Sequence, residues 1–473
     1  MNKRVLALCF AALQTCAAQS SFGEQFESIK KSATREQLYT LLWDLPKGGD
    51  IHNHFSLSNL ASQWYQAAID PKRSNGNEFF TRVRFNNCPD STEPLLRFRN
   101  IQRATFQHLS DCRKAEYVSL AALTPELKAE WLSSLKLDKP GEGRNEFFEA
   151  IVPRVGELSR DPWLAADIMV ENMKRYAAQG LRYLETQTLV STAQDHDGNP
   201  MDPERSVQIL RDALNSPDAK ATGLTVRFQQ VVIRYLPNAE EMLERAYQFV
   251  DAHRDLWVGI NMAGREDNDK GTPLRFLDTF RKMRRTYSNV PLSIHGGEVD
   301  RPGDEVRRTL TLGATRIGHG VNLITDPSTM LLMQNRRYLV EVSLISNKLL
   351  EYTPDLARHP FPEYLRMGIP VCLNTDDAGA WDSNITDEYF TAVTNFNLSW
   401  SEIVAIGRDS LFYSFAEAPV KKRMLKDYDE AVAAFERRYS TPNWQAHLTN
   451  VKPVPSGYAA HNLSLKGGQT GSN

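Results

Sequence analysis

Short apolar segments alternate with amphipathic segments along most of this chain, and this alternation limits the possible folds more than any other feature. Eight segments are predicted to be buried strands: 48–54, 181–188, 224–234, 257–264, 291–298, 315–320, 338–344 and 370–377. Helical patterns such as 162–180 and 238–253 lie between them. Eight strand–helix units predict an α/β fold, a TIM-type (β/α)8 barrel, whose ligands bind at the C-terminal ends of the strands. An open doubly wound sheet also alternates, but the Gly-rich phosphate turn expected after its first strand is missing.

The 473 residues divide into three predicted parts. Residues 1–20 combine Lys3 and Arg4 with a short apolar run and small residues, which is typical of a cleaved signal peptide. A lipoprotein leader ending at Cys16 and an ordinary N-terminal helix are the alternatives. Residues 21–451 are expected to form the barrel domain, with a helical insertion over about 70–143. The polar, Gly-rich residues 452–473 are expected to form a flexible tail.

Composition disfavours several classes of protein. The 56 basic and 58 acidic residues nearly cancel, which argues against a nucleic-acid or membrane-surface partner. No internal run reaches the roughly 20 apolar residues of a membrane span.

An exported chain would be secreted or periplasmic, where Cys88 and Cys112 could form a disulfide or remain two separate thiols. Cys372 lies in a buried strand and is expected to pack in the core.

Residue types that bind metals stand at the ends of the predicted strands. His52 and His54 are two residues apart on the first strand, so their side chains point to the same face. The fifth strand ends with His295, and the eighth ends with Asp376. Because the strand ends of a barrel form one ring, these residues are expected to meet. Three imidazoles and a carboxylate suit one Zn²⁺ ion with room for a water molecule.

Three further residues at the same strand ends suggest hydrolytic chemistry. Bound zinc lowers the pKa of water and generates hydroxide, which His319 would either hold or deprotonate. Glu298 would donate a proton to the substrate if its surroundings keep it protonated, and Asp377 would bind a substrate nitrogen. Each motif alone has a structural explanation, such as a tight glycine turn or a helix cap. Their coincidence at four strand ends predicts a metal site.

The motifs HNH, HGGE, RIGHG, SLISN and NTDD, in this order and spacing, resemble the adenosine deaminase family of the amidohydrolase superfamily. The resemblance extends from about residue 47 to 415 and includes VGINMAGRED and RDSLFYSF. It implies attack of zinc-activated hydroxide on C6 of adenosine or 2′-deoxyadenosine, a tetrahedral intermediate, and loss of ammonia. The product would be inosine or 2′-deoxyinosine.

The resemblance also implies a role for each matching position. One zinc ion per subunit would be bound by His52, His54, His295 and Asp376. Glu298 would protonate N1 of the purine, and His319 would orient the attacking hydroxide. Asp377 would bond N7, and the backbone of Gly264 would meet N3.

Some residues depart from the family pattern. Ser56 stands where many members have an aspartate that contacts the ribose, so adenine or a modified adenosine is an alternative substrate. Asn261 stands where an aspartate is usual, and Ala378 replaces a common proline. The leader and the cysteine-bearing insertion resemble the secreted, growth-factor-like branch of the family, which implies a homodimer.

Three other functions fit the sequence less well. A binuclear amidohydrolase is disfavoured because the fourth strand, VGINMAG, has no lysine to bridge two metals. The other zinc deaminase design, with a Pro-Cys-x-x-Cys signature, is absent. A non-catalytic secreted binding module on the same barrel is disfavoured because every expected ligand and Glu298 are present.

Overall fold

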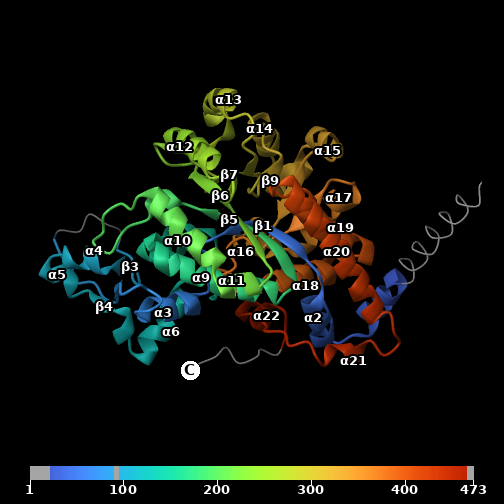
Figure 1. The fold of residues 1–473 in the computed structure, drawn as a ribbon, viewed down its shortest axis with the longest axis horizontal. Coiled ribbons are helices and arrows are strands. Elements are labelled where there is room, and N and C mark those ends of the chain that lie inside the picture. The colour runs from blue at the N-terminus through green and yellow to red at the C-terminus, as the bar shows by residue number, and fades with distance from the viewer. Residues whose placement is uncertain (1–21, 90–94, 466–473) are drawn as a thin grey trace, which may run out of the picture.

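Eight parallel strands form the centre of the molecule, which was obtained as a computed structural model describing residues 22–89 and 95–465 (Figure 1). Along the sheet they follow the order β1-β5-β6-β7-β8-β9-β10-β11. Their bounds are β1 (Gly48–His54), β5 (Leu181–Thr188), β6 (Thr225–Ile233), β7 (Trp257–Ala263), β8 (Leu292–Gly296), β9 (Arg316–His319), β10 (Leu339–Val342) and β11 (Val371–Leu373). The predicted (β/α)8 barrel is confirmed, and each of these eight strands falls within a predicted one.

The barrel closes where the candidate metal ligands lie. Asn53 of β1 and Asp376, just after β11, form a parallel bridge. The backbone N–H of Asp376 donates to the carbonyl oxygen of His52 at 3.0 Å, and the N–H of His54 donates to the carbonyl oxygen of Asp376 at 3.3 Å. Closure therefore holds the start and the end of the barrel together at the site itself.

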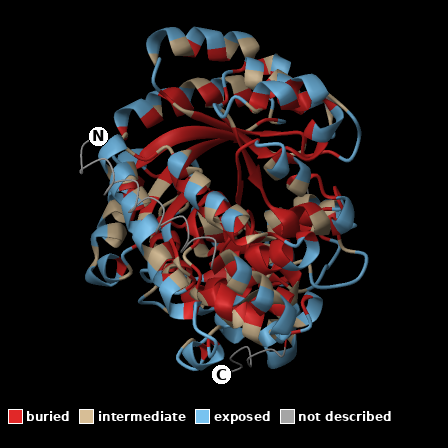
Figure 2. Ribbon diagram, turned by 90° about the vertical axis from the view of Figure 1, so that its right-hand side faces the viewer, coloured by how far each residue is buried: buried red, intermediate tan, exposed pale blue. Residues whose placement is uncertain are grey.

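Helices surround the strands on the outside of the barrel (Figure 1). Residues 22–32 are helical. The further α-helices are α2 (Arg35–Asp44), α3 (Ala61–Ile69), α4 (Arg103–Gln107), α5 (Asp111–Lys114), α6 (Pro125–Ser134), α7 (Arg144–Glu146), α8 (Val152–Val155), α9 (Pro162–Ala177), α10 (Pro203–Asn215), α11 (Pro217–Ala221), α12 (Ala239–Ala252), α13 (Leu277–Thr286), α14 (Glu305–Thr311), α15 (Pro327–Met333), α16 (Leu344–Leu349), α17 (Phe361–Arg366), α18 (Ile385–Phe396), α19 (Trp400–Phe412), α20 (Ala418–Tyr439), α21 (Gln445–Leu448) and α22 (Gly457–Asn462). Figure 2 shows buried strands inside helices whose outer faces are exposed.

Shorter helical turns join these elements. They are the 3-10 turns η1 (Leu120–Ala122), η3 (Gly156–Arg160), η4 (Val190–Thr192), η5 (Asp269–Gly271), η6 (Pro273–Phe276), η7 (Val321–Thr325) and η8 (Leu356–Arg358), and the π-helical turn η2 (Phe147–Ile151).

Local sequence signals explain where the main helices begin. The side chain of Asp161 accepts hydrogen bonds from the backbone of Trp163 and Leu164, and Pro162 occupies the first position of α9. Asn384 and Asp387 form a reciprocal capping box at the start of α18. These caps satisfy N–H groups that a helix leaves without partners, so the helices begin at defined residues next to the strands.

The insertion differs from the helical segment that was expected. It contains a three-stranded antiparallel sheet in the order β3-β2-β4, built from β2 (Phe79–Arg82), β3 (Asn100–Gln102) and β4 (Tyr117–Ser119), beside α4, α5 and α6. A small apolar cluster of its own, which includes Trp64 and Trp131, packs it against α3 and α9. Strands of three or four residues are too short to show an alternating pattern in the sequence.

The three cysteines of the described region have separate roles. Cys88 and Cys112 are joined by a disulfide within the insertion. Cys372 is a free thiol buried in β11.

The expectation of a flexible tail over 452–473 is wrong for residues 452–465. Residues 457–462 form α22, whose Tyr458 is buried. The backbone N–H of Tyr458 donates to the carbonyl oxygen of Asp382 at 2.8 Å, which attaches this segment to the loop after β11. Residues 466–473 and the expected signal peptide at 1–20 lie outside the described residues. No helix within 22–89 and 95–465 has the length and apolar character needed to cross a membrane.

Candidate active site

Four donor atoms from three strand ends converge at the top of the barrel. Nε2 of His54 lies 3.3 Å from Nε2 of His295 and 3.2 Å from Oδ1 of Asp376. Nε2 of His52 lies 3.7 Å from the same carboxylate oxygen. Two nitrogens bound to one tetrahedral zinc at about 2.05 Å would be separated by about 3.3 Å. The spacing of the donors therefore fits one zinc ion.

The donors also have the unshared electron pairs that a metal needs. Nδ1 of His295 lies 3.0 Å from Oδ1 of Asn261, which can only accept, so the hydrogen of this imidazole is on Nδ1 and Nε2 is free to bind. Nδ1 of His52 likewise lies 2.7 Å from Oε2 of Glu341. Nε2 of His52 is buried and has no hydrogen-bond partner among the described residues. A buried nitrogen without a partner is costly unless it binds a ligand.

A polar network inside the barrel supports His52 from below. Arg316 of β9 forms ion pairs with Glu341 of β10 and with Glu185 of β5. Burial alone would raise the pKa of Glu341, but the charge of Arg316 and the hydrogen bond with His52 lower this pKa to about 2. Glu341 is therefore ionised, and it holds the His52 ring by a charge-assisted hydrogen bond.

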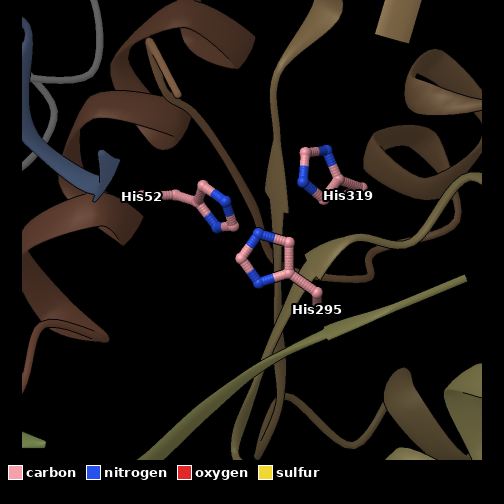
Figure 3. A group of neighbouring side chains, drawn as sticks. All are labelled: His52, His295 and His319. Atoms are coloured by element: carbon pink, nitrogen blue, oxygen red, sulfur yellow. The ribbon is translucent and has the colours of Figure 1, made fainter. Parts of the chain in front are cut away.

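His319 and Glu298 lie next to the donor group. Nε2 of His319 is 3.5 Å from Oε1 of Glu298 and 3.9 Å from Oδ2 of Asp376. Figure 3 shows the rings of His52, His295 and His319 gathered around one space. Since His319 is close to several of the same atoms, the described residues also contain the alternative ligand group His52, His295 and His319.

Burial controls the protonation of the acidic residues. The pKa of Glu298 is raised well above its usual value, first by burial and then by the negative charges of Asp376 and Glu266. The pKa of Asp377 is raised by burial and by the neighbouring carboxylates of Asp376 and Glu298. Burial would also raise the pKa of Asp376, but hydrogen bonding to His54 and the nearby imidazoles lower it. The pKa of the candidate ligand Asp376 is therefore lowered, while the pKa of its neighbour Glu298 is raised.

Two functional candidates adopt the left-handed backbone conformation. The φ angle is 64° at His319 and 55° at Asp376. This conformation is rare for residues other than glycine and costs free energy, so it persists only where the surrounding fold imposes it. Gly318 matters for a different reason, because a Cβ there would lie 2.6 Å from Cε1 of His52.

Ser56 and Gly264 follow the ends of β1 and β7, and neither belongs to a candidate metal-binding group among the described residues. Gly264 follows β7 with a φ angle of 104°, and a Cβ there would lie 2.8 Å from the ring of Tyr235. Ser56 lines a cavity of about 220 Å³ that begins at His54. Gln187, near the end of β5, lines the same cavity and is 3% exposed, and its side-chain amide has no hydrogen-bond partner among the described residues.

A second cavity of about 430 Å³ continues from the first. The two share the lining residues Val152, Ser159, Arg160, Leu189 and Thr192. The space beside the donor group therefore extends outwards to the insertion.

Several supporting residues were not identified from the sequence as part of the site. They are Glu185, Gln187, Glu266, Arg316, Glu341, Asn347 and His359. Glu341 and Arg316 carried one available signal, because a charged residue within an otherwise apolar, buried strand requires a partner. Asn347 ends the motif SLISN, which marked its segment but gave it no role, and His359 carried no signal because it meets Asn347 only through the tertiary fold.

The adenosine deaminase family model matches residues 145–431, which is more than half of the chain. An adenosine deaminase of Enterococcus faecalis is 32% identical over 174 residues, covering 37% of this chain and 50% of the relative. An N6-methyl-AMP deaminase of Danio rerio is 26% identical over 264 residues, covering 54% of this chain and 74% of the relative. The match thus spans only half of the first of these relatives.

The fold is also similar to solved amidohydrolase structures. A Burkholderia amidohydrolase, solved with bound zinc, superposes with a TM-score of 0.60 and 17% identity, covering 86% of this chain and 95% of that one. At this identity the likeness concerns the fold alone. The breadth of the family-model match, on a barrel that carries the histidine and aspartate donors at its strand ends, places the chain in the adenosine deaminase family.

Proposed function

We propose that the protein binds one zinc ion through His52, His54, His295 and Asp376 and hydrolyses adenosine and 2′-deoxyadenosine to inosine and 2′-deoxyinosine plus ammonia. The observation that carries this proposal is the convergence of the four donors next to Glu298, a buried carboxyl group whose pKa is raised by its surroundings. A metal-binding group beside a buried acid suits water attack on an aminopurine.

Each residue of the site then has a defined task. Zinc, when bound, supplies a nucleophile near neutral pH by lowering the pKa of water. Glu298 delivers its proton to N1 of the purine, which makes C6 more electrophilic, while His319 holds the attacking oxygen. Asp377, whose pKa is also raised, donates to N7, and the backbone of Gly264 meets N3. Water adds at C6, the C6–N6 bond breaks, and the amino group leaves as ammonia.

The cavity beside His54 favours a nucleoside over free adenine. It extends beyond the donor group, and its lining combines apolar side chains with Ser56 and Gln187. A sugar attached to the purine would fill this space and offer hydroxyl groups to Gln187. Free adenine would leave Gln187 without a partner, which carries a penalty. An adenosine that carries a further chemical group is the second candidate substrate, because the cavity continues past Ser159 and Arg160 toward the insertion.

The candidate ligand set disfavours the alternative function, a non-catalytic module that uses the barrel only to bind a partner. A non-catalytic module has no need to keep four converging donors, the buried acid Glu298 and the charged support of Glu341. Such a set is costly to fold because buried polar groups must all be satisfied.

We further propose that the mature protein is exported and acts as a homodimer. The leader-like composition of residues 1–20 and the Cys88–Cys112 disulfide support export to an oxidising compartment. Mass spectrometry of the N-terminus in cell fractions tests export. Light scattering of the purified protein tests the dimer, which requires twice the mass of one chain.

The decisive experiment is an ultraviolet assay of purine turnover by the purified protein. Adenosine, 2′-deoxyadenosine, adenine, AMP and N6-methyl-AMP are compared with the zinc-loaded protein, the chelated protein and the protein reloaded with zinc. Zinc-dependent formation of inosine, abolished in Glu298→Gln and unchanged in the exposed control Glu363→Gln, supports the proposal. A folded, zinc-loaded protein that deaminates no purine contradicts it, and a preference for another purine corrects the substrate.

A further inference from the structure

Two buried side chains, those of Asn347 and His359, connect His319 to the main chain of α17. Nδ2 of Asn347 lies 3.0 Å from Nδ1 of His319, and Oδ1 of Asn347 lies 3.1 Å from Nε2 of His359. Nδ1 of His359 in turn lies 3.1 Å from the backbone nitrogen of Phe361. Asn347, His359 and His319 are each at most 2% exposed. Solvent therefore does not compete for these hydrogen bonds.

The hydrogen bond between Phe361 and His359 fixes which group donates in each hydrogen bond from there to His319. A backbone N–H can only donate, so Nδ1 of His359 must accept from Phe361. Burial lowers the pKa of His359 to about 3, so its ring is neutral and carries its single hydrogen on Nε2. That hydrogen meets Oδ1 of Asn347. The NH₂ side of the Asn347 amide consequently faces His319.

This orientation determines where His319 can carry its hydrogen. Nδ1 of His319 accepts from Asn347, and a hydrogen on Nδ1 would face the donating NH₂ group. The hydrogen of a neutral ring is then on Nε2, the atom that faces Glu298 and Asp376. His319 thus presents a hydrogen-bond donor to the site. The opposite tautomer would present a lone pair and act as a base.

The fold also holds Asn347 rigidly in place. Asn347 is on α16, whose first N–H groups, those of Leu344 and Ile345, each donate to the carboxylate of Glu388 at 3.0 Å. The carbonyl oxygen of Asn347 accepts from the N–H of Thr353 at 2.8 Å. The amide therefore rests on an anchored helix and is held in place at both ends of its side chain.

We propose that Asn347 and His359 are positioning residues that hold His319 as the Nε2–H tautomer, so that His319 donates a hydrogen bond to the attacking oxygen and does not remove its proton. The catalytic part of this inference rests on the proposed function, whereas the tautomer is a property of the folded chain. It gives the structural reason why His319 would hold the attacking oxygen and not deprotonate it.

Nitrogen NMR of the folded, zinc-loaded protein with ¹⁵N-labelled histidine tests the tautomer directly. Two-bond proton–nitrogen correlations distinguish a protonated Nε2 from a protonated Nδ1, and His319→Gln identifies the signals. We expect His319 to be protonated at Nε2. A wild-type protein with His319 protonated at Nδ1 overturns the proposal.

Asn347→Asp reverses the polarity with little change in shape. A carboxylate oxygen would accept where the amide donated, so the hydrogen of His319 is expected to move to Nδ1. The matched control is Asn100→Asp, which also places a carboxylate at a buried asparagine, within the insertion. It should leave the His319 signals unchanged. A His319 tautomer that is the same in Asn347→Asp as in the wild type contradicts the proposal.

A second pair of variants tests the same inference if Asn347→Asp does not fold. His359→Gln keeps an N–H donor for Oδ1 of Asn347 and should preserve the tautomer. His359→Phe removes that donor, allows the amide to turn over, and should give a mixture of both His319 tautomers. Equal spectra for these two variants overturn the role of His359.

Kinetics provide the readout that depends on the proposed function. Asn347→Asp and His359→Phe should lower kcat with little change in KM or in zinc content, and His359→Gln should recover most of the activity. The expected loss lies between about tenfold, typical of groups that support a site, and about 10⁴-fold, seen where a wrong histidine tautomer blocks catalysis. If no purine is turned over, the proposed function fails, while the NMR result still decides the tautomer.

Discussion

Oε2 of Glu341 lies 2.7 Å from Nδ1 of His52, and the other oxygen of this carboxylate is paired with Arg316. All three residues are buried on adjacent or facing strands of the barrel interior. The arrangement links a candidate zinc ligand to the charged centre of the barrel. It makes the orientation of His52 dependent on a residue that touches neither metal nor substrate.

Replacing Glu341 with glutamine should weaken zinc binding about 10- to 100-fold, because the amide still accepts from His52 but loses the charge that raises the basicity of the ring. Competition with a chelator measures this affinity. The exposed Glu363→Gln serves as the control. A Glu341→Gln protein that binds zinc as tightly as the wild type would show that the carboxylate only balances Arg316.

Gly318→Ala should disturb the ligand group without changing its chemistry. The new Cβ would lie 2.6 Å from Cε1 of His52 and 3.2 Å from Cα of His295, both closer than ordinary contacts allow. We expect a loss of stability of about 1–3 kcal/mol, typical of overpacking, and a larger loss of zinc affinity. Thermal unfolding and zinc titration measure the two effects. Gly23→Ala, where a Cβ meets nothing within 4 Å, should change neither.

Glu266→Gln should shift the pH dependence of turnover. Glu298 acts in its protonated form, so kcat/KM falls as the pH rises through the pKa of Glu298 in the free enzyme. The negative charge of Glu266 is one cause of the raised pKa of Glu298. Its removal lowers that pKa, and the alkaline limb of the profile should move to lower pH. Glu363→Gln should leave the profile in place, and an alkaline limb that moves to higher pH in Glu266→Gln would refute the assignment of Glu298.

Gln187→Leu should raise KM for adenosine about 2- to 10-fold, the usual worth of one neutral hydrogen bond, and should leave KM for adenine unchanged. Gln187 faces the cavity with both polar atoms of its side chain unpartnered among the described residues. Steady-state kinetics with both substrates check the prediction, with the exposed Gln208→Leu as control. An equal effect on both substrates would place Gln187 at the purine.

The sequence predicted the barrel and the candidate site better than it predicted the buried residues that hold the site residues in position. Buried strands that alternate with amphipathic helices are a local signal, and His52, His295 and Asp376 are conspicuous types at strand ends. The line from His319 through Asn347 to His359 joins residues 28 and 12 positions apart. No periodic pattern encodes such contacts, because the turn of α16 and the loop before α17 create them.

The short sheet of the insertion and the ordered segment 452–465 were missed for a related reason. The sheet has very short strands packed by a small apolar cluster, and the segment 452–465 is held by backbone hydrogen bonds and a few buried side chains such as Tyr458. A composition that resembles a flexible linker is compatible with order when a neighbouring loop offers partners.

The attachment of α22 has a practical consequence for anyone who prepares this protein. Ser456 donates to Asp387, which belongs to the cap of α18, and Tyr458 binds the carbonyl oxygen of Asp382. Asp382 lies in the loop that begins at Asp376 and Asp377, and its carboxylate also pairs with Lys136 of the insertion. Truncating the chain after residue 451 would therefore remove contacts to the loop that carries Asp376 and Asp377 of the candidate site, and an affinity tag is better placed beyond residue 465.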